Sequence, residues 1–321
     1  MRVDPTSSGI RHVPVLAHEA VRWLVWRNDG VYVDATLGEG GHAELVCQQL
    51  TGGGRLLGID RDPAAHRVAR NRLRAYQERV HLFEAPFSKL GSLLDEAGLQ
   101  AVSGVLFDLG VSSAQLDVPE RGFSYQSSGP LDMRMGPDAR LTAGEIVNSW
   151  TGDELVRLFR EFGEEPFARP IARAIVRARS HRAIRTTDEL AEIIGRWGRA
   201  RREKTLARVF QSLRIAVNRE LEELESGLAT ALRYLEPGGR VVVIAYHSLE
   251  DRLVKEWVRR EASDCICPPG IPVCRCGHRA TMRPLTRRVV RPSSDETARN
   301  PRARSARMRV AERLSGEREE P

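Results

Sequence analysis

Acidic residues stand where apolar runs of the sequence end, and a glycine-rich turn follows the first of them. Asp34 ends the run that begins at Val31, residues 37–42 form the turn, and Asp60 ends the run of residues 56–60. Glycines let a ligand approach the backbone closely, and helix N-terminal amides can bind polar groups there. An acid at the tip of the second strand is placed to bind both hydroxyls of a ribose. The stretch therefore predicts a site for an adenosine-containing cofactor.

The pattern of the glycine turn alone does not identify that cofactor. Gly38, Gly40 and Ala43 fit the loose pattern G-x-G-x-x-A, which suits NAD as well as S-adenosylmethionine. A tight strand-to-helix turn without a ligand is the alternative. His42, taken alone, is typical of a capping or packing residue.

A second group of reactive side chains lies near the C-terminal end. Four cysteines and a histidine surround a Pro-Pro-Gly turn, namely Cys265, Cys267, Cys274, Cys276 and His278. These are the soft ligands of a four-coordinate structural zinc site, although C-x-C spacing is less diagnostic than C-x-x-C. Free thiols in a loop are the alternative. Cys47, alone in a helical pattern, is expected in the core.

The elements that must position these residues alternate between strand and helix. Apolar runs at residues 31–34, 56–60, 80–83 and 102–108 are separated by helical patterns, one of which opens with Asp62-Pro63 as N-cap and first residue. This alternation predicts a parallel sheet in an α/β fold, with its strand-end acids on one edge.

The alternation stops near residue 119. A stretch rich in Gly, Pro and Ser leads into segments with helical spacing only, three of which open with a capping-box pattern at Thr142, Thr151 and Thr186. We expect residues 119–210 to form an all-helical insertion.

The sheet pattern then resumes. A long helix at residues 206–235, Pro237-Gly238-Gly239 and the strand of residues 241–246 suit the second half of an S-adenosylmethionine-dependent methyltransferase sheet better than a dehydrogenase. The expected division is a first sheet part (1–118), the insertion (119–210), a second sheet part (211–284) with the cysteine loop 265–278, and a tail (285–321). The arginine-rich tail is expected to be partly disordered.

Composition narrows the class of protein. With 321 residues and 41% hydrophobic content, the chain can bury a substantial core. No apolar run approaches the roughly 20 residues that span a bilayer, and the polar N-terminus lacks a signal peptide's apolar segment. Five cysteines, an odd number, do not form a secreted disulfide framework. We expect a cytoplasmic protein without a membrane partner.

The net charge of +7 is concentrated in two regions. Residues 279–321 hold twelve arginines and six acids, and residues 179–208 hold nine basic and four acidic residues. Such regions indicate a polyanionic partner, because phosphate contacts release counterions. Solvated, solubilising faces are the alternative.

Seven peptides together resemble one family, the bacterial small-subunit ribosomal RNA methyltransferase H or MraW family. They are residues 12–16 (HVPVL), 38–42 (GEGGH), 58–63 (GIDRDP), 108–113 (DLGVSS), 121–125 (RGFSY), 129–135 (GPLDMRM) and 246–252 (YHSLEDR). The resemblance implies a class I, Rossmann-like methyltransferase sheet with an inserted helical domain. It also implies methyl transfer from S-adenosylmethionine to the exocyclic N4 of a cytidine in the decoding region of 16S rRNA. The implied partner is this rRNA or the small ribosomal subunit, and no DNA is expected.

The same resemblance implies the cofactor contacts. They are Gly40, Gly41 and His42 at the turn, Asp60 on the ribose, Phe87 near the adenine, and Asp108 with Gln115 closing the pocket. Local chemistry supports Asp60 and Phe87, whereas Gln115 taken alone could equally be a surface residue.

For the chemical step, an amino nitrogen conjugated with the cytosine ring needs alignment and acceptors for its hydrogens. Asp108, or the turn of residues 109–113 with Ser112 and Ser113, could hold this amino group; the alternative is that Asp108 contacts the cofactor only. Tyr246 could stack on the target base and His247 could bond to it, or this strand-end pair could be structural.

Two rival functions stay open from the residues alone. A nicotinamide-dependent oxidoreductase would use the same glycine turn, and a ribosome-assembly factor could keep the fold without turnover. A shift in melting temperature with S-adenosylmethionine rather than with NADH would exclude the oxidoreductase.

Overall fold

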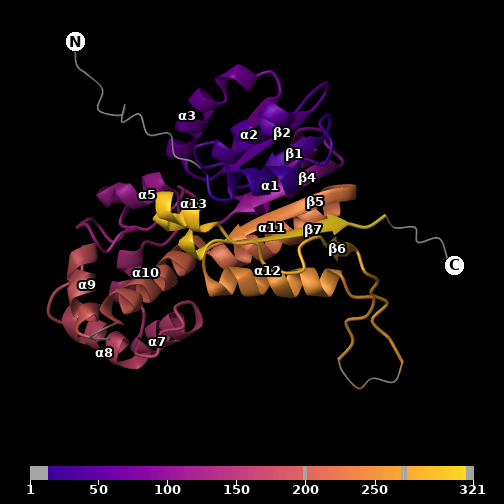
Figure 1. Cartoon of the computed structure of the whole chain (residues 1–321). Helices are drawn as coiled ribbons and strands as arrows, with labels where there is room; N and C mark the ends of the chain where they lie inside the picture. The colour runs from indigo at the N-terminus through magenta and orange to yellow at the C-terminus, as the bar shows by residue number, and fades with distance from the viewer. Residues whose placement is uncertain (1–13, 198–200, 269, 271–272, 316–321) are drawn as a thin grey trace, which may run out of the picture.

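A seven-stranded sheet with helices on both faces and an adjoining helical unit make up the protein (Figure 1). The structure, a computed structural model, describes residues 14–197, 201–268, 270 and 273–315. The strands are β1 (Val31–Asp34), β2 (Arg55–Asp60), β3 (Val80–Glu84), β4 (Val102–Asp108), β5 (Leu235–Ala245), β6 (Met282–Pro284) and β7 (Arg307–Arg313). Their order is β3-β2-β1-β4-β5-β7-β6.

The first five strands run parallel, and β7 runs antiparallel between β5 and β6. The expected α/β fold with a largely parallel sheet is confirmed. The strand order reverses between β1 and β4, where open parallel sheets bind their ligands at the carboxyl ends of the strands.

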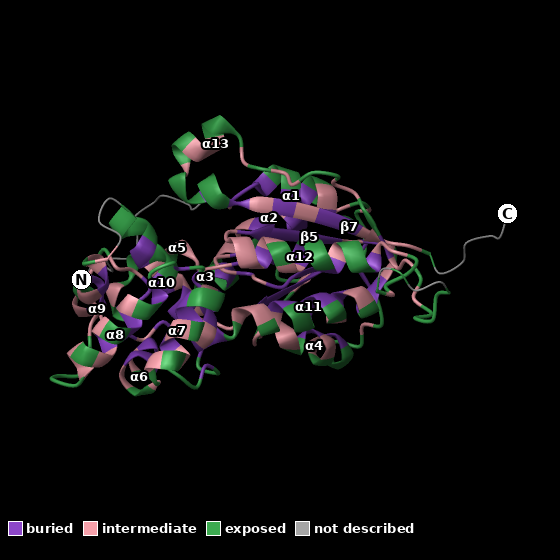
Figure 2. Ribbon diagram, turned by 90° about the horizontal axis from the view of Figure 1, so that it is seen from below, coloured by how far each residue is buried: buried purple, intermediate pink, exposed green. Residues whose placement is uncertain are grey.

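Alternate residues of the strands face two separate cores. Tyr32, Val242 and Ile244 pack with α1 (Ala17–Leu24) and α2 (Gly41–Gln49) on one face. Val33 and Val243 pack with α4 (Leu90–Glu96), α11 (Glu220–Tyr234) and α12 (Ser248–Glu261) on the other. Both faces are covered, so the strands read as continuous apolar runs. Figure 2 shows the buried residues gathered on the inward sides of α11, α12 and the strands.

The helices fall into two groups. Around the sheet lie α1 (Ala17–Leu24), α2 (Gly41–Gln49), α3 (Pro63–Arg72), α4 (Leu90–Glu96), α5 (Ser113–Asp117), α11 (Glu220–Tyr234), α12 (Ser248–Glu261) and α13 (Ser294–Arg299). The helical unit contains α6 (Ala143–Ser149), α7 (Gly152–Glu161), α8 (Ala168–Arg179), α9 (Thr187–Gly195) and α10 (Arg202–Asn218). Short 3₁₀ turns include η2 (Phe87–Lys89), η3 (Pro119–Arg121) and η5 (Pro301–Ser305).

The helical unit has a hydrophobic core of its own, built from residues between Phe123 and Val217. Three of its helices, α6, α7 and α9, begin at the predicted capping boxes. The hydroxyls of Thr142 and Thr151 accept the backbone N–H groups of Glu145 and Glu154, at 3.1 and 3.3 Å, as in a capping box.

The prediction of one long helix at residues 206–235 is wrong. It is two helices, α10 and α11, separated by Arg219, whose φ of 53° is left-handed. The expected strand also begins earlier, at Leu235. Its Pro-Gly-Gly segment forms a bulge within β5, because Leu235 pairs with Val102 while Arg240 pairs with Gly104.

The tail also differs from the expectation of partial disorder. From residue 285 to residue 315 it contains α13, η5 and β7, and β7 lies inside the sheet. Residues 316–321 lie outside the described residues. The disorder was predicted from the high arginine content of the tail. That content hid the apolar residues Met308 and Val310, which alternate with arginines and are fully buried. Within the described ranges, none of the helices has the length and apolarity that crossing a bilayer requires.

Candidate active site

A cavity of about 350 Å³ lies over the carboxyl ends of β1, β2 and β4. The sheet supplies its floor, the helical side supplies Met135 and Arg214, and the C-terminal segment supplies Arg302. This volume is in the range of small-molecule sites, which measure about 300–1,000 Å³. The cavity therefore occupies the position that the strand order predicts for a ligand.

The glycine turn forms one wall of this cavity. Gly38, with a φ of 50°, donates its N–H to Asp60 Oδ2 at 2.7 Å. Gly41 sits against Pro14, where an added Cβ would lie 3.1 Å from the proline ring. Gly40 is not among the described residues that line the cavity; its φ of 78° serves the left-handed N-cap of α2 instead.

Asp60 stands at the tip of β2 and faces the cavity. Its carboxylate accepts N–H groups from Gly38 at 2.7 Å and Asp62 at 2.8 Å. Burial raises the pKa of Asp60, and these two N–H groups oppose the rise. The two bonds fix the carboxylate, and each oxygen keeps a lone pair for a ligand hydroxyl.

Asp108, His42 and Tyr246 form a connected cluster on the cavity floor. Asp108 Oδ1 accepts the Tyr246 hydroxyl at 2.8 Å, and its Oδ2 lies 3.5 Å from His42 Nδ1. Burial raises the pKa of Asp108 to about 7, although the bond from Tyr246 lowers it. Burial and the adjacent Asp108 raise the pKa of Tyr246 well above its usual value, so the phenol keeps its proton.

His42 is held as a neutral ring. Its Nε2 lies 3.0 Å from the Val15 carbonyl, which can only accept, so this nitrogen carries the proton. Burial lowers the pKa of His42, which leaves Nδ1 as an acceptor toward Asp108. The carboxyl and the imidazole can therefore share one proton near neutral pH.

Behind this cluster, Asp34 is buried at the end of β1. Burial raises its pKa to about 7, His42 lowers it and Asp108 raises it. Thr36, which sequence reasoning missed, joins the two acids: its N–H donates to Asp34 Oδ1 at 3.3 Å, and its hydroxyl accepts the Asp108 N–H at 2.6 Å. The sequence feature that could have pointed to Thr36 is its position two residues after the strand-end acid Asp34.

Phe87 lies at the cavity wall just beyond β3. Its ring packs edge-to-face on Phe107, with the centroids 5.5 Å apart. Gly227 of α11 makes this packing feasible, because a Cβ there would lie 2.9 Å from the Phe87 ring. The ring is fixed in place and offers an apolar surface to a ligand.

Ser112, Ser113 and Gln115 also line the cavity. Ser112 and Gln115 form the capping box of α5: the Ser112 N–H donates to Gln115 Oε1 at 3.0 Å. The Gln115 amide donates to Asp62 Oδ2 at 2.9 Å. Both ends of the Gln115 amide are bonded to the protein itself, which favours a positioning role for this side chain.

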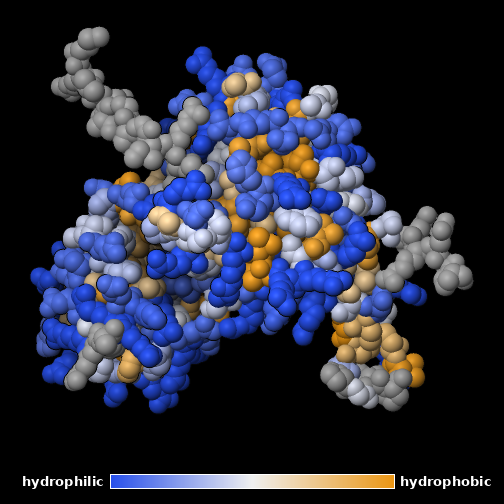
Figure 3. Space-filling model, viewed as in Figure 1, coloured by the Kyte–Doolittle hydropathy of each residue, from blue (hydrophilic) through white to orange (hydrophobic). Residues whose placement is uncertain are grey.

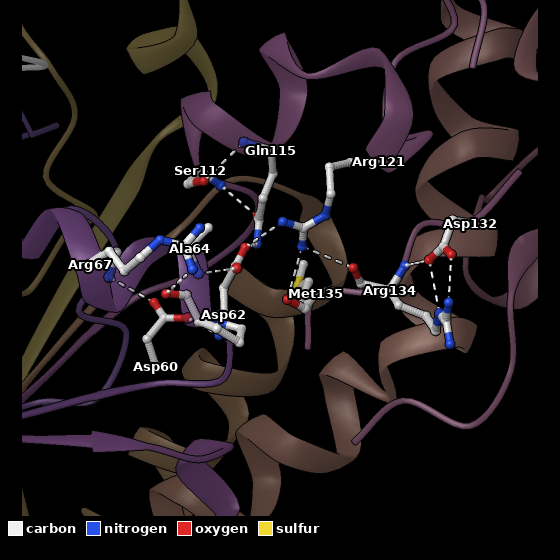
Figure 4. Close-up of polar contacts among 12 residues, drawn as sticks. Asp60, Asp62, Ala64, Arg67, Ser112, Gln115, Arg121, Asp132, Arg134 and Met135 are labelled. Carbon is white, nitrogen blue, oxygen red and sulfur yellow. Dashed lines mark hydrogen bonds and ion pairs between the residues drawn. The ribbon is translucent and has the colours of Figure 1, made fainter. Parts of the chain in front are cut away.

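Figure 4 shows how the loop after α5 is tied to the sheet edge through Asp62. Asp62 caps α3 by accepting the Ala64 N–H, and its Oδ2 also accepts Arg121 Nη1 at 2.8 Å. The second terminal nitrogen of Arg121 donates to the carbonyls of Arg134 and Met135 at 3.1 and 3.0 Å. One guanidinium therefore joins the cavity edge to the loop of residues 129–135.

His247 is not among the described residues that line the cavity. It is the N-cap of α12, and its Nε2 lies 3.1 Å from Glu250 Oε1. Burial would raise the pKa of Glu250, but His247 and Arg214 hold it below its usual value. Glu220, His247 and Glu250 lie close enough to share a metal ion, yet capping and the Arg214–Glu220 ion pair at 2.8 Å account for their positions.

The structure thus brings most of the expected site residues together. Those that line the cavity are Gly41, His42, Asp60, Phe87, Asp108, Ser112, Ser113, Gln115 and Tyr246. Sequence reasoning missed Arg214 and Arg302, which come from α10 and from a tail expected to be partly disordered. No local pattern marks either arginine.

Known proteins match this chain over nearly its whole length. The model of the MraW methylase family matches residues 9–314. The chain is 51% identical over 314 residues to the ribosomal RNA small subunit methyltransferase H of Thermomicrobium roseum, covering 97% of this chain and 96% of that protein.

Two further relatives carry the same name. The protein from Brevibacillus brevis is 46% identical, with 96% of this chain and 100% of that protein covered. The protein from Dehalococcoides mccartyi is 48% identical, with 94% of this chain and 86% of that protein covered. The matched range includes the sheet, the helical unit and β7.

Proposed function

The chain belongs to the MraW methylase family, and from this membership we propose that it methylates small-subunit ribosomal RNA with S-adenosylmethionine as methyl donor. The finer proposal is transfer to the exocyclic N4 of a cytidine in the decoding region of 16S rRNA. The observation that supports it is that one cavity contains both the strand-end acid Asp60 and the cluster of Asp108, His42 and Tyr246. The first group suits a ribose, and the second suits an amino group.

The cavity residues fit the cofactor. Asp60 would bind the ribose hydroxyls, Phe87 would contact the adenine, and the turn at Gly41 leaves room for the ligand because it carries no side chain. Bound S-adenosylmethionine supplies a methyl group already activated by its sulfonium. Gly40 and Gln115 would act indirectly, by shaping the turn and by holding α5.

The protein's own groups must orient the acceptor nitrogen and remove a proton. Asp108 is 22% exposed as a side chain, and its exposed part faces the cavity. As an ionised carboxylate it can accept a hydrogen from an amino group, which directs the nitrogen lone pair away from the ring. With a pKa of about 7, Asp108 is also suited to take up the proton released after transfer.

Tyr246 is best described as a positioning residue for Asp108, because its hydroxyl is bonded to the carboxylate. Its ring lies over Gly110, where an added Cβ would come within 3.5 Å. Ser112 and Ser113 also line the cavity, at the end of the turn of residues 109–113. Backbone groups of this turn could contact a base as well. The capping role of His247 argues against its contact with the base.

RNA would enter beside the helical unit. A base recognised in this way must be unpaired or turned out of its stack, since its Watson–Crick edge has to reach the cavity floor. The two basic regions would contact phosphates. The RNA substrate implies that the protein works in the cytoplasm.

Methylation in vitro tests this function. Small subunits isolated from cells lacking the modification, and protein-free 16S rRNA, are incubated with the chain and labelled S-adenosylmethionine. We expect label in N4-methylcytidine when the nucleosides are separated by mass spectrometry. Label in another nucleoside would refute the N4 proposal, and no label in either RNA would refute the activity.

Two variants control this experiment. Asp60→Ala removes the expected ribose acceptor and should abolish labelling at low cofactor concentration. Asp29→Ala removes an exposed acid just before β1 and should leave labelling unchanged.

A further inference from the structure

The loop between α12 and β6 brings four cysteines together, and none of the four lines the cavity. The Sγ atoms of Cys265, Cys267, Cys274 and Cys276 all lie within 4.8 Å of one another. Figure 3 shows this loop as an apolar-coloured arm that stands out from a mostly hydrophilic surface. We propose that the four thiolates bind one structural Zn²⁺ ion and that this ion organises the arm.

The distances between the sulfurs carry the proposal. They are 3.5 Å between Cys274 and Cys276, 3.9 Å between Cys276 and Cys265, and 4.0 Å between Cys267 and Cys274. A tetrahedral site with zinc–sulfur bonds of about 2.3 Å has sulfur–sulfur edges of about 3.8 Å. A disulfide needs about 2.05 Å. The four sulfurs are therefore spaced as the corners of a zinc tetrahedron.

Backbone N–H groups support negative charge on these sulfurs. Ile266 donates to Cys276 Sγ, and Arg275 donates to Cys267 Sγ, each at 3.4 Å. Each of the two C-x-C segments thus directs an N–H group at a sulfur of the other segment. Hydrogen bonds to the charged form stabilise it, and a metal site needs thiolates.

His278, expected as a fifth candidate ligand, is not in the cluster. Its Nε2 lies 2.9 Å from the carbonyl of Arg260, where it acts as donor. The Thr281 N–H donates to the Glu261 carbonyl at 2.8 Å, and the Ala280 N–H donates to Asp264 Oδ1 at 3.2 Å. These bonds close the base of the arm and leave four cysteines as a complete ligand set.

Above its hydrogen-bonded base, the described part of the arm has little apolar packing. Its large apolar residues Ile266 and Val273 are 46% and 68% exposed, so the described part of the arm contains no hydrophobic core. Residues 262–281 exceed the length of about 12–15 residues at which loops without secondary structure become uncommon. A metal ion is a usual way to stabilise a segment too small to bury a core.

Metal analysis of the full chain, purified without chelator, tests the site. We expect about one zinc per chain, and close to none in Cys265→Ser or Cys274→Ser. Cys47→Ala and His278→Gln should keep the ion, because Cys47 is buried in α2 and His278 lies outside the cluster. Less than a tenth of an equivalent after incubation of reduced protein with Zn²⁺, or full retention in both serine variants, would overturn the proposal.

Two further measurements check the ligands and the role of the ion. Replacement by Co²⁺ should give the intense thiolate-to-metal absorption of a four-sulfur tetrahedral site in the native chain, Cys47→Ala and His278→Gln, but in neither serine variant. Chelation should speed tryptic cleavage after Arg275 and Arg279 at least tenfold, while melting of the sheet changes little. Unchanged cleavage on removal of bound zinc would refute the organising role.

Discussion

Asp108 is the residue on which the proposed chemistry depends, and two polar neighbours hold its carboxyl while a third holds its backbone. Tyr246 donates to Oδ1, His42 faces Oδ2, and Thr36 accepts the backbone N–H. The carboxyl is thereby held at one angle toward the cavity. Such fixed acceptors stabilise developing charge without reorganising during the reaction.

Replacing Asp108 with Asn tests its catalytic role. Asn keeps the size of the side chain but cannot take up a proton, so we expect the single-turnover rate at saturating cofactor to fall about 10²-fold to 10⁴-fold. Cofactor affinity, measured by calorimetry, should change by less than tenfold. A large loss of affinity with an intact rate would show that Asp108 serves cofactor binding only.

The raised pKa of Asp108 also predicts how stability varies with pH. The carboxyl titrates near pH 7 when folded and near pH 3.8 when unfolded, so the folded chain binds more protons between these values. Its contribution to the free energy of unfolding must then fall as pH rises through this window, by at most about 1.4 kcal/mol per pH unit.

Comparison with Asp108→Asn isolates this contribution from the other carboxyls. The variant should gain stability relative to the native chain from pH 4 to pH 7, and the difference should be constant above about pH 8. Denaturant unfolding at each pH measures it. A difference independent of pH would mean that burial does not perturb this carboxyl.

At the scale of elements, the contact between the sheet edge and the helical unit rests on a few polar side chains. Arg121 bonds to Asp62 and to two loop carbonyls. Asn218, at the end of α10, donates to the Met133 carbonyl and accepts the Met135 N–H, both at 2.8 Å. Both residues therefore hold the loop of residues 129–135 through its backbone.

Arg121→Gln should loosen this loop. The substitution leaves the nearly buried Asp62 without its cation, so we expect a loss of about 1–3 kcal/mol in unfolding free energy. Weaker cofactor binding should accompany it, because Asp62 also holds Gln115 and Asp60.

Arg134→Gln is the matched control. The side chain of Arg134 is exposed and pairs with Asp132, whereas only its carbonyl takes part in the Arg121 network. It should cost less than about 1 kcal/mol. Equal losses in the two variants would contradict the role given to Arg121.

Local features of this fold could be predicted from the sequence, and features set by distant contacts could not. The glycine turn, the strand-end acids and the Thr142 capping box are encoded within a few residues. The break at Arg219 has no glycine or proline to mark it, and the distant Arg61 donates to the carbonyl of the preceding Asn218. Similarly, β7 pairs with β5 across some 65 residues, and its arginines concealed the buried Met308.

The candidate site follows the same division. Asp60 and Asp108 could be placed at one edge because parallel strands share their carboxyl ends. Arg302 could not, since it reaches the cavity through the packing of the tail on α5, where it pairs with Asp117 at 2.6 Å. The role of His247 could not be decided from the sequence, because a capping role and a base-binding role have the same sequence signature.

Across the whole molecule, part of the basic excess is used internally. Arg307 and Arg309 pair with Asp251 at 3.2 and 2.7 Å, and Arg283 pairs with Glu312 at 2.6 Å. These arginines stabilise the sheet rather than a complex. Exposed side chains such as Arg287 and Lys204 remain as candidates for contact with phosphate.

Salt dependence of RNA binding tests that role. The logarithm of the binding constant should fall linearly with the logarithm of salt concentration, and each lost contact should reduce the slope by about 0.7–0.9. We expect this reduction for Arg287→Gln and for Lys204→Gln, measured by filter binding. Arg283→Gln removes the same charge from an internal pair and should leave the slope unchanged; identical slopes in all three variants would exclude phosphate contact by Arg287 and Lys204.

The position of β7 in the sheet has a consequence for biosynthesis. A ribosome makes β5 and β6 before β7, yet β7 must pair with both of them, and Arg302 reaches the cavity just ahead of it. The nascent chain therefore waits with an open gap in its sheet until residue 313 has left the exit tunnel. An enzyme that modifies ribosomal RNA would thus gain a complete pocket only after Arg302 and β7 have emerged from the ribosome that makes it.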